Sequence, residues 1–463
     1  MYDNRTMEAL LFLQLCLWGI ALAVKPPSNF RVDTYDENRN LVTLAWNNEE
    51  GYDKFIFRIH CDGYDDIQND RRGGPETYQW GGIIGGLAYK FSMEAGMQNP
   101  NHIEHGHYSP WVDLYWVAPH PQWSLSTISD GGKAAPTTGM ASVSRLPETM
   151  EYWYIRPDGG VEGVWYGGRE QAWHAYELAP AGSASTKSGM AAISRVYNQM
   201  EVWFVSPDGT LVDCLWVQGQ QWKCENRSGP GALSTETQIA AVSRDKDHIE
   251  LFAYTQDGGV LDFFYKEGAG WGIWQFIPPK VTSYTGGISA VARDANNVDV
   301  FVTRNDGSVR HHWWTEGHNW NDEELAPRES ASLVGSIKAI SRQSNTIELW
   351  YIGPWGNVMD HYWYEGDRWK SFQMAPNGSA DGYGSLTAVS RYLDAMEMWY
   401  TTADDSLVGC KWFADARWKC YPIITPSPVS HAAKLTAVSR VANQIELFYV
   451  DQHGDVTDRS YAP

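Results

Sequence analysis

The sequence predicts an all-β protein in which a β-sandwich precedes a seven-bladed β-propeller. Three sets of residues recur through residues 119–463 with a period of 49 or 50. Within one unit, four short apolar or alternating stretches are separated by turn-forming clusters, and no stretch has a helical period. Units of four strands and this length, repeated seven times, are typical of propeller blades.

Residues 1–23 are predicted to form a signal peptide. The apolar run of residues 10–24 is shorter than a membrane span, and residues 21–23 (Ala-Leu-Ala) supply a small-x-small cleavage signature. Acidic residues outnumber basic ones ahead of the run, which leaves an uncleaved membrane anchor as the alternative. Cleavage predicts a secreted, extracellular chain without membrane insertion.

Residues 24–118 lack the repeat and predict one β-sandwich. Five stretches have the apolar or alternating character of strands: residues 30–32, 41–46, 55–60, 87–91 and 111–117. A Pro-Pro start, Trp46 at the end of the second stretch and a tyrosine opening a late one resemble a fibronectin type III module.

The repeat in residues 119–463 is carried by three registers. A Ser-Arg or Ala-Arg dipeptide closes the first stretch of every unit, with the arginine at Arg145, Arg195, Arg244, Arg293, Arg342, Arg391 and Arg440. An acid follows six residues later, at Glu151, Glu201, Glu250, Asp299, Glu348, Glu397 and Glu446. A tryptophan leads the fourth stretch, at Trp123, Trp173, Trp222, Trp271, Trp320, Trp369 and Trp418.

The tryptophan register also predicts how the propeller closes. It begins before the first repeated arginine, and the chain stops before an eighth tryptophan could follow. The strand around Trp123 is therefore expected to complete the last blade beside Tyr461. Pairing the start of the domain with its end removes an open sheet edge.

Four cysteines are predicted to form two disulfides within hairpins. Cys214 and Cys224 have the same ten-residue spacing as Cys410 and Cys420, and the two pairs lie four repeats apart. Disulfides agree with secretion, because they persist in oxidising compartments.

Charge and histidine placement exclude other classes of ligand. The formal net charge of −20 argues against nucleic acid, whose phosphate backbone needs a concentrated basic face. No metal or cofactor is predicted, because His311 and His312 are neighbours on a strand and point to opposite faces.

Arginine, carboxylate and aromatic side chains together provide the chemistry that holds a sugar. Hydroxyls accept from a guanidinium and donate to a carboxylate, while the C–H face of the ring lies on an aromatic side chain. The third stretch has an aspartate in four units. The other three units have His311, Gly163 and Gly409 at the equivalent position. Three predicted sugar-binding sets result: Arg195, Glu201, Asp213 and Trp216; Arg244, Glu250, Asp262 and Tyr265; Arg342, Glu348, Asp360 and Trp363. The alternative is that arginine and acid form a repeated cross-strand ion pair with no ligand.

Repeats such as MAAISRVYNQMEVWFVSPDGTLVDCLWVQGQQW resemble the fungal fucose-specific lectin superfamily, and particularly the seven-bladed lectins of that type in bacteria and ascomycete fungi. The resemblance implies a multivalent lectin whose partners are fucose-containing glycans or glycoproteins. In the six-bladed fungal lectins a second-strand arginine and a third-strand glutamate hold fucose. Here the second-strand position is Glu201, the third-strand acid is Asp213, and the arginine has moved to the end of the first strand.

Two other classes compete with a lectin. Propellers also include glycoside hydrolases, and both predicted domains suit a scaffold that docks other proteins. A glycosidase needs a pair of carboxylates with distinct environments at one unique site. Acids repeated seven times in similar contexts favour binding over catalysis, so no enzyme activity is expected. The sequence leaves the oligomeric state open.

Overall fold

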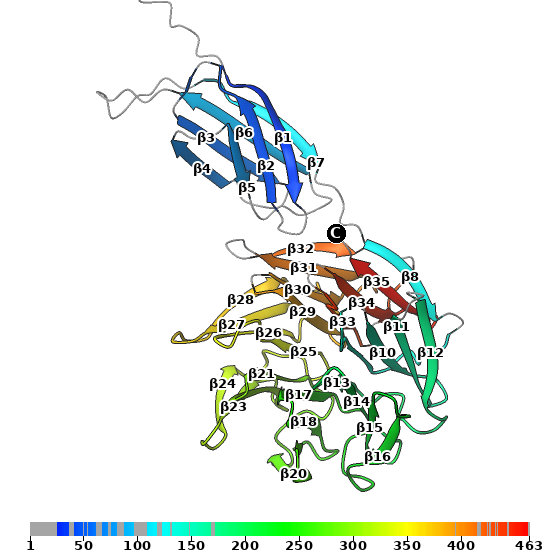
Figure 1. The fold of residues 1–463 in the computed structure, drawn as a ribbon. Coiled ribbons are helices and arrows are strands. Elements are labelled where there is room, and N and C mark those ends of the chain that lie inside the picture. Colours follow the sequence, from blue (N-terminus) through cyan, green and yellow to red (C-terminus); the bar gives the residue numbers. More distant parts are fainter. Residues whose placement is uncertain are drawn as a thin grey trace, which may run out of the picture. The chain divides into compact units, whose positions relative to one another are not determined.

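The computed structural model describes residues 26–36, 41–49, 51–52, 54–61, 67–72, 76–80, 88–96, 109–117, 123–129, 132–147, 149–167, 172–393, 395–413, 418–423, 425, 427–430, 432, 434–441 and 444–461. All regular structure in these residues is β-strand, and none of them forms a helix that could cross a membrane. The chain divides into two compact units, residues 1–121 and 122–463 (Figure 1). The predicted signal peptide, residues 1–23, lies outside the described residues.

The N-terminal unit consists of two antiparallel sheets. One contains β1 (Ser28–Asp36), β2 (Leu41–Asn47) and β5 (Thr77–Trp80); the other contains β4 (Ile67–Arg72), β3 (Lys54–Cys61), β6 (Ala88–Gly96) and β7 (Val112–Val117). Side chains from both sheets share one core, with Trp46, Phe57 and Phe91 at its centre. Alternate residues of a strand face the same side, which is why Phe55 and Phe57 are both buried.

The C-terminal unit contains seven four-stranded antiparallel sheets in its described residues, numbered I to VII here. Sheet I has β9 (Met140–Val143), β10 (Met150–Ile155), β11 (Val161–Gly167) and β12 (Ala172–Ala179). Sheet II has β13 (Met190–Ile193), β14 (Gln199–Val205), β15 (Leu211–Val217) and β16 (Lys223–Asn226). Sheet III has β17 (Ile239–Asp245), β18 (His248–Tyr254), β19 (Val260–Lys266) and β20 (Gly270–Ile277). Sheet IV has β21 (Ile288–Asp294), β22 (Asn297–Thr303), β23 (Val309–Thr315) and β24 (Asn321–Ala326).

Sheet V has β25 (Ile337–Ile340), β26 (Thr346–Ile352), β27 (Val358–Tyr364) and β28 (Lys370–Ala375). Sheet VI has β29 (Leu386–Tyr392), β30 (Ala395–Thr401), β31 (Leu407–Phe413) and β32 (Lys419–Ile423). Sheet VII has β33 (Thr436–Val438), β34 (Ile445–Val450), β35 (Val456–Tyr461) and, from the start of the unit, β8 (Trp123–Ser129). In each sheet the strands lie side by side in sequence order, and β8 takes the fourth place in sheet VII.

The first strands of the sheets surround the centre of the unit. Each contacts the first strand of the next sheet, and β33 contacts β9. Figure 1 shows first strands such as β13, β17 and β25 toward the middle and fourth strands such as β16, β20 and β24 toward the outside. The sheets therefore follow one another around a common axis.

Both faces of each sheet are buried against its neighbours. On β14, Val202 and Phe204 pack toward sheet I, while Trp203 and Val205 pack toward sheet III. A strand covered on both faces buries apolar residues on both sides. This explains why the second stretches of the repeats are largely apolar, as in β26, whose residues are all buried and are apolar except for Thr346 and Glu348.

The predicted closure is confirmed by the strand pairing. β8 is antiparallel to β35, with Trp123 opposite Tyr461. The Trp123 ring lies 5.4 Å from the Tyr461 ring and meets Trp399 of sheet VI edge to face at 6.4 Å. Sheet VII thus obtains its outer strand from the other end of the unit.

Both predicted disulfides are present. Cys214 pairs with Cys224 and Cys410 with Cys420, each linking directly opposite residues of the third and fourth strands. The bridges occupy equivalent places in sheets II and VI.

Candidate functional site

The repeated arginine joins each sheet to the next one. In sheet II the Arg195 guanidinium forms an ion pair with Glu201 at 2.7 Å and lies 4.9 Å from the ring centre of Tyr265 in sheet III. It also donates to the main-chain carbonyl of Lys246, in the first loop of sheet III. The contact to the ring recurs at 4.6 to 5.3 Å in all seven sheets: Arg145 with Trp216, Arg195 with Tyr265, Arg244 with Trp314, Arg293 with Trp363, Arg342 with Trp412, Arg391 with Tyr461 and Arg440 with Tyr166.

This geometry corrects the composition of the three predicted sets. Trp216 was grouped with Arg195, but it lies beneath Arg145 of the preceding sheet, and Trp363 likewise lies beneath Arg293. The reason is the period of a strand. Asp213 and Trp216 are three residues apart, so their side chains point to opposite faces. The aromatic side chain at each junction therefore comes from the following sheet.

The arginine and the second-strand acid form an ion pair in five sheets. The distances are 3.8 Å for Arg145 to Glu151, 2.7 Å for Arg195 to Glu201, 2.8 Å for Arg293 to Asp299 and 3.0 Å for Arg440 to Glu446, and Arg391 pairs with Glu397. The Arg195 and Glu201 side chains are only 6% and 5% exposed. Such burial agrees with the alternative that the pair is a structural device.

In sheets III and V the second-strand acid contacts the third-strand acid instead of forming an ion pair with the arginine. Glu250 hydrogen-bonds Asp262, and Glu348 hydrogen-bonds Asp360, so two carboxyl groups meet at each place. In sheet V, Arg342 forms no ion pair with Glu348 and donates instead to the Tyr364 hydroxyl at 2.9 Å. Two buried carboxylates in contact repel each other, and a shared proton removes that repulsion.

Burial raises the pKa of all four acids, and the neighbouring carboxyl raises the pKa of Asp262 and Glu348 further. The pKa of Asp262 and that of Glu348 lie well above their ordinary values, and burial raises that of Asp360 to about 7. In sheet II burial and the Glu201 charge raise the pKa of Asp213 to about 7, although Arg227 lies 2.6 Å away and opposes the shift.

The raised pKa values predict a pH-dependent stability. A carboxyl that binds its proton more tightly when folded contributes stability that is fully present below its ordinary pKa, about 4, and is lost as the pH rises through the folded value. Glu348→Gln keeps a hydrogen-bonding side chain but removes one ionisable group. At about pH 8 we expect its melting temperature to exceed that of the wild type by several degrees, with little difference near pH 4.

Glu397→Gln is the matched control for that prediction. Glu397 occupies the same register but pairs with Arg391, so its loss should lower the melting temperature at every pH. Equal pH profiles for Glu348→Gln and the wild type would contradict the shared-proton interpretation.

Glycine replaces the third-strand acid where a tyrosine fills the space. A Cβ atom at Gly163 would meet the Tyr176 ring at 2.4 Å. The Tyr176 hydroxyl accepts from Trp153 Nε1 at 2.9 Å and donates to Glu151 at 3.2 Å. In sheet VI, Gly409 faces Tyr421 in the same way. These two junctions are therefore filled by their own side chains.

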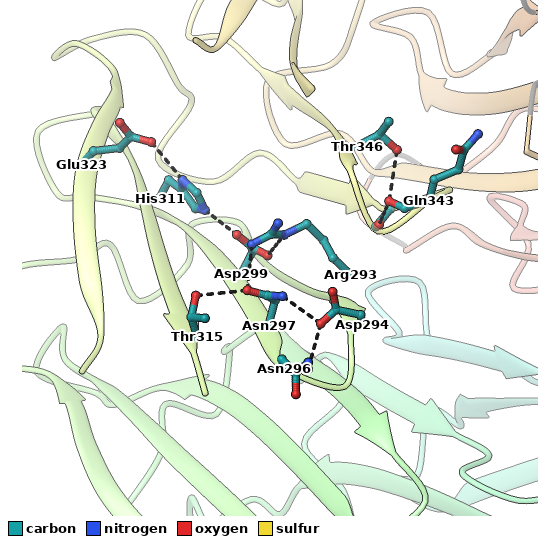
Figure 2. Close-up of polar contacts among 11 residues, drawn as sticks. Arg293, Asp294, Asn296, Asn297, Asp299, His311, Thr315, Glu323, Gln343 and Thr346 are labelled. Carbon is teal, nitrogen blue, oxygen red and sulfur yellow. Dashed lines mark hydrogen bonds and ion pairs between the residues drawn. The ribbon is translucent and has the colours of Figure 1, made fainter. Parts of the chain in front are cut away.

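The junction of sheets IV and V is an open groove of about 570 Å³. Arg293 Nε donates to Asp299 at 2.8 Å, and His311 lies between Asp299 at 2.9 Å and Glu323 at 3.1 Å, as Figure 2 shows. Burial lowers the pKa of His311, but the hydrogen bonds to these two carboxylates raise it above its ordinary value overall. The result is a charged chain of guanidinium, carboxylate, imidazole and carboxylate along one wall.

Three tryptophans complete the lining of this groove: Trp313, Trp363 and Trp369. Trp369 Nε1 donates to Glu323 at 3.0 Å, which fixes the carboxylate at the rim. Trp313 lies two residues after His311 and so faces the same side of β23. Its position is occupied by different residue types in other sheets, including Leu215 and Lys411.

A second groove of about 490 Å³ lies between sheets V and VI. It is lined by Glu348, Tyr362, Tyr364, Phe372, Trp412 and Trp418. The third predicted set thus contributes Glu348 here, while Trp412 of sheet VI takes the place that was assigned to Trp363.

Sequence reasoning missed the first groove because it ranked junctions by the presence of aspartate. His311 was recognised as an exception, but Glu323 on the fourth strand and Trp313 were not considered as its neighbours. The signal that could have found them is the two-residue spacing of His311 and Trp313. Within the described residues, no group of His, Cys, Asp or Glu side chains is arranged to hold a metal ion.

The fold is shared with known lectins. The BP39L lectin from Burkholderia pseudomallei matches with a TM-score of 0.65 and 18% identity, over 71% of this chain and 96% of that one. AofleA from Arthrobotrys oligospora matches with a TM-score of 0.50 and 15% identity, over 66% and 91%. The Aleuria aurantia lectin, described as a six-bladed β-propeller with a novel fucose recognition mode, gives 0.48 and 16%, over 64% and 99%.

The sequence matches no protein-family model and no curated protein. At 15% to 18% identity the structural matches establish a common fold. The chain is accordingly an all-β protein that shares its fold with BP39L and AofleA.

Proposed function

We propose that the chain is a secreted, multivalent carbohydrate-binding protein, a lectin for fucose-containing glycans, and not an enzyme. Residues 119–463 would form a seven-bladed β-propeller and residues 24–118 a fibronectin type III-like module. The observation that carries the proposal is the groove between sheets IV and V, where three tryptophans, a guanidinium and carboxylates line one open volume. The shared fold with BP39L supports it.

The lining of this groove suits a monosaccharide. Carboxylates accept from sugar hydroxyls, and an imidazolium or guanidinium donates to them. A volume of about 570 Å³ falls within the usual range for small-ligand sites. Trp313 offers a ring beside these polar groups, in a position that varies among the sheets. Fucose is the sugar that the resemblance of the repeats implies.

The predicted sets remain proposals in a regrouped form, each with the aromatic residue of the following sheet. They are Arg342, Glu348 and Asp360 with Trp412, Arg195, Glu201 and Asp213 with Tyr265, and Arg244, Glu250 and Asp262 with Trp314. Of these, the first contributes Glu348 and Trp412 to the groove of about 490 Å³. Two or more grooves on one rigid unit would raise avidity for a glycan-covered surface by about 10² to 10⁴ over a single site.

Secretion is supported by the two disulfides and by the predicted signal peptide, residues 1–23. The proposed partners are glycans or glycoproteins.

Binding is favoured over hydrolysis by the distances between acids. Glycosidases keep their two carboxyl groups about 5 to 10 Å apart so that a sugar or water fits between them. The pairs Glu250 with Asp262 and Glu348 with Asp360 are in hydrogen-bond contact instead. They therefore leave no room for a scissile bond.

The decisive experiment is a glycan array with the full chain, followed by calorimetry with monovalent fucose on Trp313→Ala. We expect the wild type to bind fucosylated glycans, and we expect the variant to lose one binding site per chain because its groove lacks the ring that lies on the same face of β23 as His311. Trp355→Ala is the matched control, since Trp355 is 73% exposed and lies outside both grooves.

Other outcomes would replace the proposal. Release of fluorophore from a panel of fluorogenic glycosides would point to an enzyme. An array without any bound glycan, combined with binding to deglycosylated proteins, would point to a docking scaffold. An unchanged number of sites in Trp313→Ala would remove this groove from the proposed sites.

A further inference from the structure

The centre of the C-terminal unit holds a cavity of about 190 Å³. Its walls come from the first strands of all seven sheets and the residues just before them. At about 30 Å³ per water molecule the space equals roughly six waters. It is separate from the two grooves, which share no lining residue with it.

The charge of this cavity is opposite to that of the chain. Among the described residues that line it, the ionisable side chains are Lys338 on β25 and Lys434 just before β33, and no carboxylate, histidine or arginine faces them. The chain as a whole has a formal net charge of −20. Two half-buried cations thus line this cavity without an acidic partner among its described lining residues.

The repeat shows that the two lysines are departures from a small-residue pattern. Lys338 lies opposite Trp350, and the residues opposite the equivalent second-strand aromatics are Ala141, Ala191, Ala240, Ser289, Thr387 and Thr436. The positions equivalent to Lys434 hold Gly139, Gly189, Gln238, Gly287, Ser336 and Ser385. Apart from Gln238, the side chains at these positions are small and leave the interior free for two long ones from sheets V and VII.

Burial makes these ammonium groups costly without an anion. It lowers the pKa of Lys338 and brings that of Lys434 to about 8. Lys434 therefore remains largely protonated near neutral pH, and a desolvated ammonium gains free energy when an anion approaches it.

Hydroxyl groups in the wall add neutral donors. Ser289 Oγ accepts from the main-chain N–H of Ala339 at 3.0 Å, and Ser385 Oγ accepts from that of Leu435 at 2.8 Å. Each hydroxyl still carries a hydrogen that can be donated to a ligand. Ammonium and hydroxyl donors in one small cavity match the oxygens of a tetrahedral oxyanion.

We propose that the central cavity binds one small inorganic oxyanion of the sulfate or phosphate class between Lys338 and Lys434. The anion neutralises the two ammonium groups and stabilises the ring of first strands from which they project. Sugar binding in the outer grooves is not required for it.

The test is thermal unfolding of the full chain titrated with sodium sulfate or inorganic phosphate, at an ionic strength held constant with bulky gluconate. We expect a saturating rise in melting temperature for the wild type, as mass action requires for a ligand of the folded state. The rise should be absent in the double variant Lys338→Met, Lys434→Met. It should shrink in the wild type as the pH passes about 8, where Lys434 loses its proton.

Lys223→Met is the matched control, because Lys223 is 76% exposed on an outer strand and should respond to sulfate as the wild type does. Equilibrium dialysis with labelled sulfate gives a second readout, expected at one anion per wild-type chain and none per double variant. The double variant keeps its apolar stems in place and loses two buried charges, so it should fold without anion. An equal response of wild type and double variant, or no bound sulfate in dialysis, would overturn the proposal.

Discussion

Deletion of residues 119–130 is expected to open the ring of sheets, lower the melting temperature sharply and cause aggregation. β8 lies within this segment and supplies the outer strand of sheet VII. Its removal exposes the hydrogen-bonding edge of β35 and strips Trp123 from the core it shares with Trp399 and Tyr461. An unpaired strand edge is a template for association between chains. Thermal unfolding and sedimentation of the deleted chain measure both effects.

Two single substitutions distinguish the effect of losing strand β8 from the effect of losing the Trp123 side chain. Trp123→Ala keeps the strand and should cost stability without causing aggregation. Leu125→Thr changes a residue that is 42% exposed on the same strand and should leave both readouts unchanged. A soluble, monomeric deletion with an unchanged melting temperature would show that β8 does not close the unit.

The repeat made most of the C-terminal fold predictable. The spacing of 49 or 50 residues placed every sheet, and Trp123, which precedes the first repeated arginine, indicated the closing strand. The ten-residue spacing of the cysteines placed both disulfides, because a repeated spacing implies a repeated hairpin.

The strands of the N-terminal unit were less predictable, because its sequence lacks the repeat. All five predicted strands are present, but β4 and β5 were not expected. The sequence of β4, IQNDRR, has one apolar residue in six, so it lacks the alternation that marks a strand with one buried face. Such a strand is held by pairing with β3, which a single sequence does not reveal.

The candidate site was predictable by residue type but not by partner. Arginine and an aromatic ring do meet at every junction, and the arginine pairs with the acid in five sheets, yet the aromatic residue comes from the next sheet. The repeated spacing shows which residues occupy equivalent positions along the chain. It does not show which residues of two different repeats come into contact where their sheets meet. Gly163 illustrates the same limit, because the loss of an acid there is compensated by Tyr176 from another strand.

Arg391→Ala is expected to destabilise the chain by about 3–5 kcal/mol, the usual cost of removing one partner from a buried ion pair. Arg391 and Glu397 are 1% and 2% exposed, and the guanidinium also lies 5.0 Å from the Tyr461 ring centre. Truncation leaves the Glu397 carboxylate buried without its cation. Arg145→Ala is the matched control in the same register, where the pair is longer, at 3.8 Å, and 20% and 12% exposed.

For that control we expect a loss of about 1 kcal/mol or less, since partly solvated pairs contribute little. The double variant Arg391→Met, Glu397→Gln carries no buried charge and should recover much of the stability lost in Arg391→Ala. Denaturant unfolding of the three variants, with calorimetry against fucose on the same samples, decides the role of the register. A stable Arg391→Ala that loses a fucose site would assign the arginine to the ligand. An unstable Arg391→Ala that keeps every fucose site would show that the arginine stabilises the contact between neighbouring sheets. Sugar recognition would then depend on the variable residues of the grooves, such as Trp313.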